Sequence, residues 1–194
     1  MLFPFPGRSV VLALTSLILC ACGANYETIA IKDYRLHVVN KDESLQTEFR
    51  NLVAEFNFKA DRKVLTYVDD ASDANSAIII TKNLEARDGK VGWGQWLSES
   101  EEDNPIFHAP GSQPKRRVEY SMRLEFDEDY IRERMNTGDW ESIVEKQKLF
   151  FHEVGHGLEM SHHRSRADVM YHDISGTKNF DTFFKRVRNY MSDQ

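Results

Sequence analysis

Residues His152 to His162 read HEVGHGLEMSH, and this segment constrains the fold more than any other part of the chain. An α-helix repeats about every 3.6 residues, so positions i and i+4 lie on one face and His152 and His156 can bind the same metal ion. His162 can join them only if the chain turns sharply after the helix. Three protein ligands with an open fourth position are typical of a catalytic zinc site. Glu153 lies close enough to hold a water molecule against the metal.

The first residues of the chain resemble a lipoprotein signal rather than part of the fold. Arg8 precedes an apolar run, Val10 to Leu19, which is too short to cross a bilayer and has the length of a signal-peptide core. The following Leu19-Cys20-Ala21-Cys22 resembles the lipobox of bacterial lipoproteins. That resemblance implies cleavage after Ala21 and a lipid on Cys22. The alternative is an ordinary signal peptide with an unmodified cysteine.

These features predict three segments. Residues 1–21 form the signal peptide, residues 22–33 a short tether, and residues 34–194 one domain. We expect this domain to be a monomer in the bacterial cell envelope, anchored by lipid, with the outer membrane favoured. The net charge of −6 and the scattered basic residues do not indicate nucleic-acid binding.

The hydrophobic pattern predicts an α/β domain. Strands are expected at 34–39, 64–68, 77–81, 90–97 and 118–126, and helices from Ser44 to about residue 56, from Trp140 to about Leu158, and at 181–191. Asp139 is the expected N-cap of the helix that carries the histidines. The acidic, proline-containing stretch from Ser98 to Pro114 is the expected long loop.

Three segments now carry a family resemblance. HEVGHGLEMSH resembles the metzincin signature HExxHxxGxxH, and more narrowly its matrixin form HExGHxLGLxH. The run from Asp168 to Tyr171, DVMY, is similar to the matrixin Met-turn, and Leu124 to Asp129 is similar to the strand end that precedes the matrixin zinc helix. The resemblance implies a metzincin-like catalytic domain with a twisted five-stranded mixed sheet, two long helices, a zinc helix, a Met-turn and a C-terminal helix.

The resemblance also implies a role for each matched residue. His152, His156 and His162 would bind one catalytic Zn²⁺, Glu153 would be the general base, and Met170 would lie beneath the metal. Tyr171 would lie beside the specificity pocket for substrate residues after the cleaved bond. The implied activity is zinc-dependent hydrolysis of peptide bonds in extended polypeptides.

Glu159 departs from this pattern, because the family has glycine at its position. That glycine lets the chain turn with positive φ, which costs a glutamate roughly 1–3 kcal/mol. In a rival geometry the helix continues, and Glu159 replaces His162 as the third ligand. The matrixin residues that bind structural zinc and calcium have no counterpart here, so we expect no structural zinc. Calcium binding by the acidic loop is possible but unsupported.

Two other functions stay open on the sequence. The chain can be a non-catalytic zinc-binding lipoprotein of the envelope, since five of its histidines fall between 152 and 172. It can also be a pseudopeptidase, if Glu159 distorts the site. Glu153 distinguishes these functions from hydrolysis, because a metal store does not need a carboxylate at that position.

Overall fold

The computed structural model describes residues 26–84, 90–102, 115–176 and 178–192. Six strands form one sheet: β1 (Glu27–Ile31), β2 (Tyr34–Val39), β3 (Leu65–Tyr67), β4 (Ser76–Thr81), β5 (Gly92–Glu102) and β6 (Lys115–Asp127). The helices of the described residues are α1 (Glu43–Ala60), α3 (Glu128–Thr137), α4 (Trp140–Gly157) and α5 (Phe180–Ser192), with a short 3₁₀ turn at Ala71–Asp73. None of these helices is both long enough and apolar enough to cross a bilayer.

Strand β6 is the centre of the sheet. One of its edges pairs with β5 over almost its whole length, and the other pairs with β1 in its first half and β4 in its second. Strands β2 and β3 continue the sheet beyond β4. All of these pairings are parallel except that between β5 and β6, which is antiparallel. Strand β5 therefore forms an edge of a mostly parallel sheet.

One face of the sheet is covered by helices. Alternate residues of β6, Met122, Leu124 and Phe126, point inward and are buried. The ring of Phe126 lies 5.1 Å from that of Phe49 in α1 and 6.0 Å from that of Phe150 in α4, measured between centroids, so both helices pack on this face. Helix α5 packs on the two helices through its own phenylalanines, Phe183 and Phe184.

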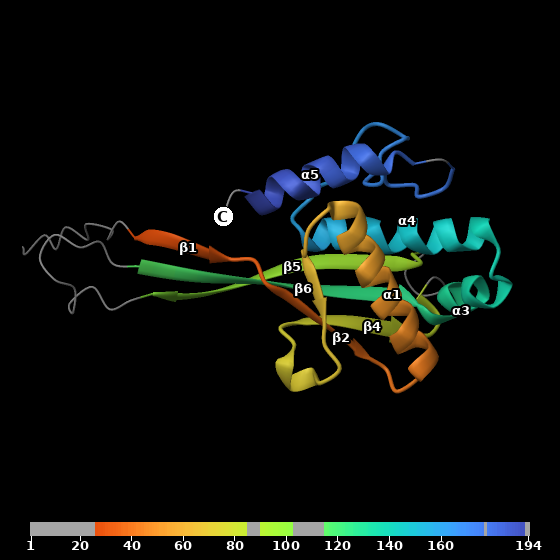
Figure 1. The fold of residues 1–194 in the computed structure, drawn as a ribbon, viewed down its shortest axis with the longest axis horizontal. Helices are drawn as coiled ribbons and strands as arrows, with labels where there is room; N and C mark the ends of the chain where they lie inside the picture. Colours follow the sequence, from red (N-terminus) through yellow and green to blue (C-terminus); the bar gives the residue numbers. More distant parts are fainter. Residues whose placement is uncertain (1–25, 85–89, 103–114, 177, 193–194) are drawn as a thin grey trace, which may run out of the picture.

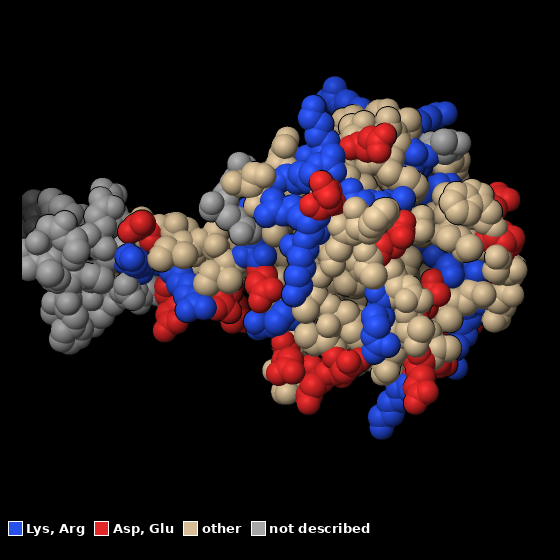
Figure 2. Space-filling view, viewed as in Figure 1, with Lys and Arg blue, Asp and Glu red and all other residues tan. Residues whose placement is uncertain are grey.

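The sheet extends beyond the helices as an arm. Figure 1 shows β1, the end of β5 and the start of β6 projecting from the body. The side chains of the arm are mostly exposed, which fits its position outside the helical layer. Figure 2 shows acidic and basic side chains on both the arm and the body, a mixture typical of solvated surface.

The structure corrects three expectations. The expected five-stranded mixed sheet has six strands and is mostly parallel, because Glu27–Ile31, within the expected tether, pairs with β6 as strand β1. The expected loop from Ser98 is strand as far as Glu102, since it pairs antiparallel with β6; residues 103–114 lie outside the described residues. Helix α3 was not expected, because only Glu128 and Ile131 are buried and its apolar pattern is weak.

The helical expectations are largely confirmed. Two long helices, α1 and α4, are present, and α4 ends within one residue of the predicted boundary. Asp139 is the N-cap of α4, because its side chain accepts a hydrogen bond from the backbone of Ser142. The C-terminal helix is also present as α5. The proposed signal peptide and Cys22 lie outside the described residues.

Candidate metal centre

The last two turns of α4 carry two of the three predicted histidines. His152 is buried and His156 half-buried, one helical turn apart on the same face. The helix ends at Gly157 with the two hydrogen bonds of a Schellman motif, from the Glu159 amide to the His156 carbonyl (3.1 Å) and from the Met160 amide to the Gly155 carbonyl (2.9 Å). This turn reverses the chain and brings His162 back to the helix.

The three histidines point one nitrogen each at a common point. The Nε2 atom of His156 lies 3.2 Å from that of His152 and 3.2 Å from that of His162. Tetrahedral zinc with Zn–N bonds of about 2.0–2.1 Å separates its nitrogen ligands by about 3.3 Å. The cluster therefore has the dimensions of a three-histidine metal site, as the spacing in the sequence predicted.

The other ring nitrogens fix the orientation of two of these imidazoles. His152 Nδ1 lies 2.7 Å from the Val169 carbonyl oxygen, and His156 Nδ1 lies 3.0 Å from that of Met160. A carbonyl only accepts, so each Nδ1 carries the proton and each Nε2 presents a lone pair in the neutral ring. Burial lowers the pKa of His152 to about 4 and also lowers that of His156, which keeps both rings neutral at pH 7. A cation between the facing lone pairs removes their repulsion.

Glu153 lies beside the histidines at the wall of a cleft. Its side chain is buried, and burial raises its pKa to about 8. The cleft has a volume of about 550 Å³. Its walls come from the start of β5 and the residues just before it, from α4, from His162 and from the segment after Tyr171: Lys90, Val91, Gly92, Trp93, Gly94, Leu149, His152, Glu153, His156, His162, His172, Asp173 and Ile174.

Edge strand β5 packs unusually closely against α4. A Cβ atom at Gly94 would lie 2.2 Å from the backbone oxygen of Glu153, and one at Gly92 would lie 2.8 Å from Glu153 Oε1. At Gly94 the obstructing atoms belong to the helix backbone, so only glycine permits this approach, whereas at Gly92 they are the ends of side chains. These glycines bring the rim of the cleft to Glu153.

Met170 packs against the helix that carries His152 and His156. It is fully buried, and its sulfur is so close to α4 that a Cβ at Gly155 would lie 2.2 Å from it. The turn is fixed by Asp168, whose carboxylate accepts hydrogen bonds from the Met170 amide (2.8 Å) and from Arg186 of α5 (2.5 Å). Asp168 belongs to the DVMY run, but its hydrogen bond with Arg186 was not expected from the sequence, because it depends on how α5 packs.

Tyr171 was expected beside a substrate-specificity pocket. It lines a second cavity of about 510 Å³, next to the cleft and sharing His172 and Asp173 with it, but does not line the cleft that contains the histidines. The ring of His172 is tilted by 43° against that of Tyr171, with 4.1 Å between their centroids, and His172 lines both cavities. Lys178 places its ammonium 5.3 Å from the centre of the Tyr171 ring.

Glu159 is not part of the histidine cluster. Its φ is +61°, the left-handed conformation expected at this position if His162 is the third ligand. The helix does not continue, so the rival geometry with Glu159 as a ligand is not formed.

Comparison with known proteins does not assign this site to a family. A scan against protein-family models finds no match, and a search of curated proteins finds no significant relative. The class that the fold and site define is an α/β domain with a three-histidine cluster, consistent with a zinc site. The resemblance to metzincins therefore depends on the sequence motifs alone.

Proposed function

We propose that the protein is a zinc-dependent endopeptidase of metzincin type that hydrolyses extended polypeptides. The observation that carries this proposal is the convergence of three histidines, in which the Nε2 atom of His156 lies 3.2 Å from those of His152 and His162, with Glu153 buried beside them at a cleft. A structural zinc site has four protein ligands, whereas three ligands leave one position for water and substrate. A metal store needs no buried carboxylate next to its ligands.

The chain's own residues then have distinct roles. His152, His156 and His162 would hold Zn²⁺, which when bound lowers the pKa of its water towards about 7 and polarises the scissile carbonyl. Glu153 takes the proton from the attacking water and delivers it to the leaving amine. This proton transfer requires the ionised carboxylate, and a nearby divalent cation opposes the burial that raises the pKa of Glu153.

Edge strand β5 supplies a binding surface for the substrate. Its outer edge pairs with no other described strand, and residues 90–94 form one wall of the cleft. An extended peptide can add to such an edge through backbone hydrogen bonds. Backbone pairing of this kind is largely independent of side chains, so it favours polypeptide substrates in extended form.

The decisive experiment separates metal binding from catalysis. The Glu153→Ala variant is expected to bind zinc with the stoichiometry of the wild type, yet to lose peptidase activity on a mixed-peptide library by about 10²–10⁴-fold, the usual contribution of a general base. Glu141→Ala is the matched control, because Glu141 is exposed in the first turn of the same helix.

The alternatives predict different results. If the wild type binds one zinc and cleaves no peptide, the protein is a non-catalytic zinc-binding protein or a pseudopeptidase. If the wild type and Glu153→Ala cleave equally, Glu153 is not the base and the proposed mechanism is wrong. We also propose that Cys22 is lipidated and holds the domain at the bacterial envelope; the lipobox-like sequence supports this.

A further inference from the structure

One peptide group of the Met-turn is hydrogen-bonded on both of its sides. The carbonyl oxygen of Val169 accepts a hydrogen bond from His152 Nδ1 at 2.7 Å. The amide of the same peptide group belongs to Met170, and it donates to Asp168 Oδ1 at 2.8 Å. The Val169–Met170 peptide group therefore lies between a candidate metal ligand and a carboxylate, and it joins them through two short hydrogen bonds.

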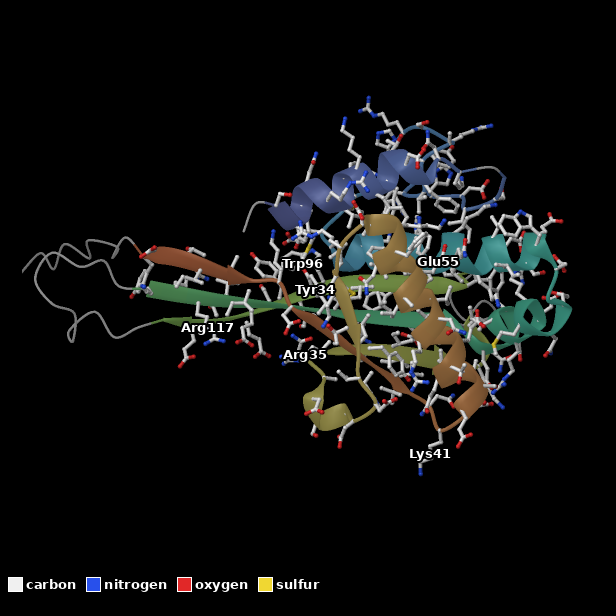
Figure 3. All side chains as sticks on the ribbon, viewed as in Figure 1. Tyr34, Arg35, Lys41, Glu55, Trp96 and Arg117 are labelled. Atoms are coloured by element: carbon white, nitrogen blue, oxygen red, sulfur yellow. The ribbon has the colours of Figure 1, made fainter. Side chains whose placement is uncertain are left out.

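The Asp168 carboxylate is held from the C-terminal helix. Asp168 is 2% exposed, and its Oδ1 atom lies 2.5 Å from Nη2 of Arg186 in α5. Helix α5, blue in Figure 3, runs along α4, and its Phe184 packs on Phe151 of α4 with 5.2 Å between the ring centroids. The position of the carboxylate is thus set by helix packing as well as by the turn.

The hydrogen bonding of this ion pair is incomplete. Asp168 Oδ2 and Arg186 Nε are buried without a hydrogen-bond partner among the described residues. The Nδ1 atom of His163 lies 3.8 Å from Oδ2, which is too far for a hydrogen bond. A buried ion pair with unpaired polar atoms contributes little to stability. Stability alone therefore gives a poor account of this carboxylate, whose short bond to the Met170 amide points to the metal site.

A carboxylate on the amide side of a peptide group strengthens the hydrogen bond on its carbonyl side. Negative charge near the Met170 N–H draws electrons of the peptide group towards the Val169 oxygen, since hydrogen bonds in a chain polarise one another. A more negative oxygen holds the His152 Nδ1 proton more strongly, which fixes the ring and makes Nε2 a better donor to a metal ion. Asp168 then acts on His152 as a directly bonded carboxylate does, with one peptide group between them.

The same turn also contacts the segment that carries His162. The carbonyl of Met170 accepts a hydrogen bond from the His163 amide at 2.7 Å. His163 follows His162 directly, and the His162 Nε2 atom lies 3.2 Å from that of His156. Asp168 therefore fixes a turn that contacts one histidine of the cluster through its ring and a second through the next residue of the chain.

We propose that Asp168 is a positioning residue for the metal site, and that it holds and polarises His152 through the Val169–Met170 peptide group. The proposal rests on the metal site described under Proposed function. It gives α5 a part in metal binding through Arg186, although α5 supplies no member of the histidine cluster. Contacts behind metal ligands typically change metal affinity by 10–100-fold, and we expect about tenfold here because a peptide group separates Asp168 from His152.

The zinc affinities of a graded series test this role in the full-length protein. Competition with a chromophoric chelator is measured for wild type, Asp168→Asn and Asp168→Ala. Asparagine keeps an oxygen acceptor without the charge, and charge-assisted hydrogen bonds are roughly twice as strong as neutral ones. Asp168→Asn should therefore bind zinc several-fold more weakly than wild type, and Asp168→Ala about tenfold more weakly.

Asp139→Asn is the matched control for this series. The Asp139 side chain also accepts a hydrogen bond from a backbone amide, that of Ser142 at 2.8 Å, but it lies at the other end of α4. The same loss of charge at this position should leave zinc affinity unchanged.

Histidine NMR gives a second measurement that loss of stability does not mimic. In the folded, zinc-saturated protein an Nδ1 proton resonates further downfield when its hydrogen bond is stronger, so Asp168→Asn should move the Nδ1 proton of His152 upfield. The Nδ1 proton of His156 is the internal control, because it donates to the Met160 carbonyl at 3.0 Å, outside the Met-turn. Its signal should not move. Asparagine matches aspartate in size, so this comparison stands even if Asp168→Ala does not fold.

The outcomes separate the two proposals. If wild type binds no zinc, the metal site itself is wrong. If wild type binds zinc and Asp168→Asn binds it equally well, the positioning role is wrong and the metal site stands. Equal shifts of the His152 and His156 signals, or weaker binding without a shift of the His152 signal, would also overturn the role, because the effect then does not pass through the one peptide group.

Discussion

Replacing Gly94 with alanine should destabilise the protein more than the same change at Gly92 or Gly138. The new Cβ would lie 2.2 Å from the backbone oxygen of Glu153 and 2.9 Å from its carbonyl carbon. Ordinary contact requires about 3.5 Å, so β5 and α4 must separate by roughly 1.3 Å. Overpacking against rigid neighbours costs about 1–3 kcal/mol, and we expect the upper end because the obstructing atoms belong to a helix backbone.

The other two glycines are matched controls for this change. At Gly92 the nearest atoms, Glu153 Oε1 and Leu149 Cδ1 at 2.8 Å each, belong to side chains that can rotate. Gly92→Ala should therefore cost only about 1 kcal/mol, the low end for overpacking, while displacing the carboxylate of Glu153. At Gly138 nothing lies within 4 Å of an added Cβ, and φ is +63°. Gly138→Ala should cost about 1 kcal/mol through its backbone conformation alone.

Urea unfolding of the metal-free proteins, followed by circular dichroism, measures these differences as changes in the free energy of unfolding at constant m. The reasoning is refuted if Gly94→Ala is no less stable than Gly138→Ala. Peptidase assays add a second comparison. Gly92→Ala should lose far more activity than its stability loss accounts for, since a displacement of about 1 Å at a catalytic group can cost 10²-fold in rate.

Two further predictions concern pH and localisation. Burial raises the pKa of Glu153 from 4.5 to about 8, so in the metal-free protein its contribution to stability is present below pH 4.5 and is lost as pH rises to about 8. Burial lowers the pKa of His152 from 6.5 to about 4, so its contribution is present above pH 6.5 and is lost as pH falls towards 4. As the pH rises from 5 to 8, the melting temperature of the metal-free Glu153→Gln variant should therefore fall less than that of the metal-free wild type. Parallel curves of melting temperature against pH for the two proteins would contradict this. Cys22→Ser should abolish fatty-acid labelling and release the protein from the membrane fraction; unchanged labelling would show that Cys22 is not the lipidated residue.

The sequence predicted the elements with strong periodicity and the residues within one motif. Helix α4 was correctly bounded because Asp139 is a good N-cap and the apolar residues of the helix recur at helical spacing. The three histidines were correctly grouped because two share a helical face, and because a turn at residue 159 was required for the third. The left-handed conformation of Glu159 follows from that requirement, even though glutamate is a poor residue for it.

The parts that the sequence did not predict depend on contacts between distant segments. Strand β1 lies within the expected tether, and its pairing with β6 gives no local signal. The second half of β5 is acidic and resembled a loop, but its backbone pairs along β6. The Tyr34–Tyr190 contact joins the first and last parts of the domain, so no motif of adjacent residues could identify it.

The central position of β6 has a consequence for the order of folding. Segments β2 to β4 with α1 are consecutive in the chain and β2 pairs with both β3 and β4, so they can form a nucleus from local contacts. Strand β1, although it comes first, pairs only with β6 among the described strands and must wait until residue 119 is available. Because this pairing closes a longer stretch of chain than any other among the described strands, we expect the first strand to be the last to join the sheet.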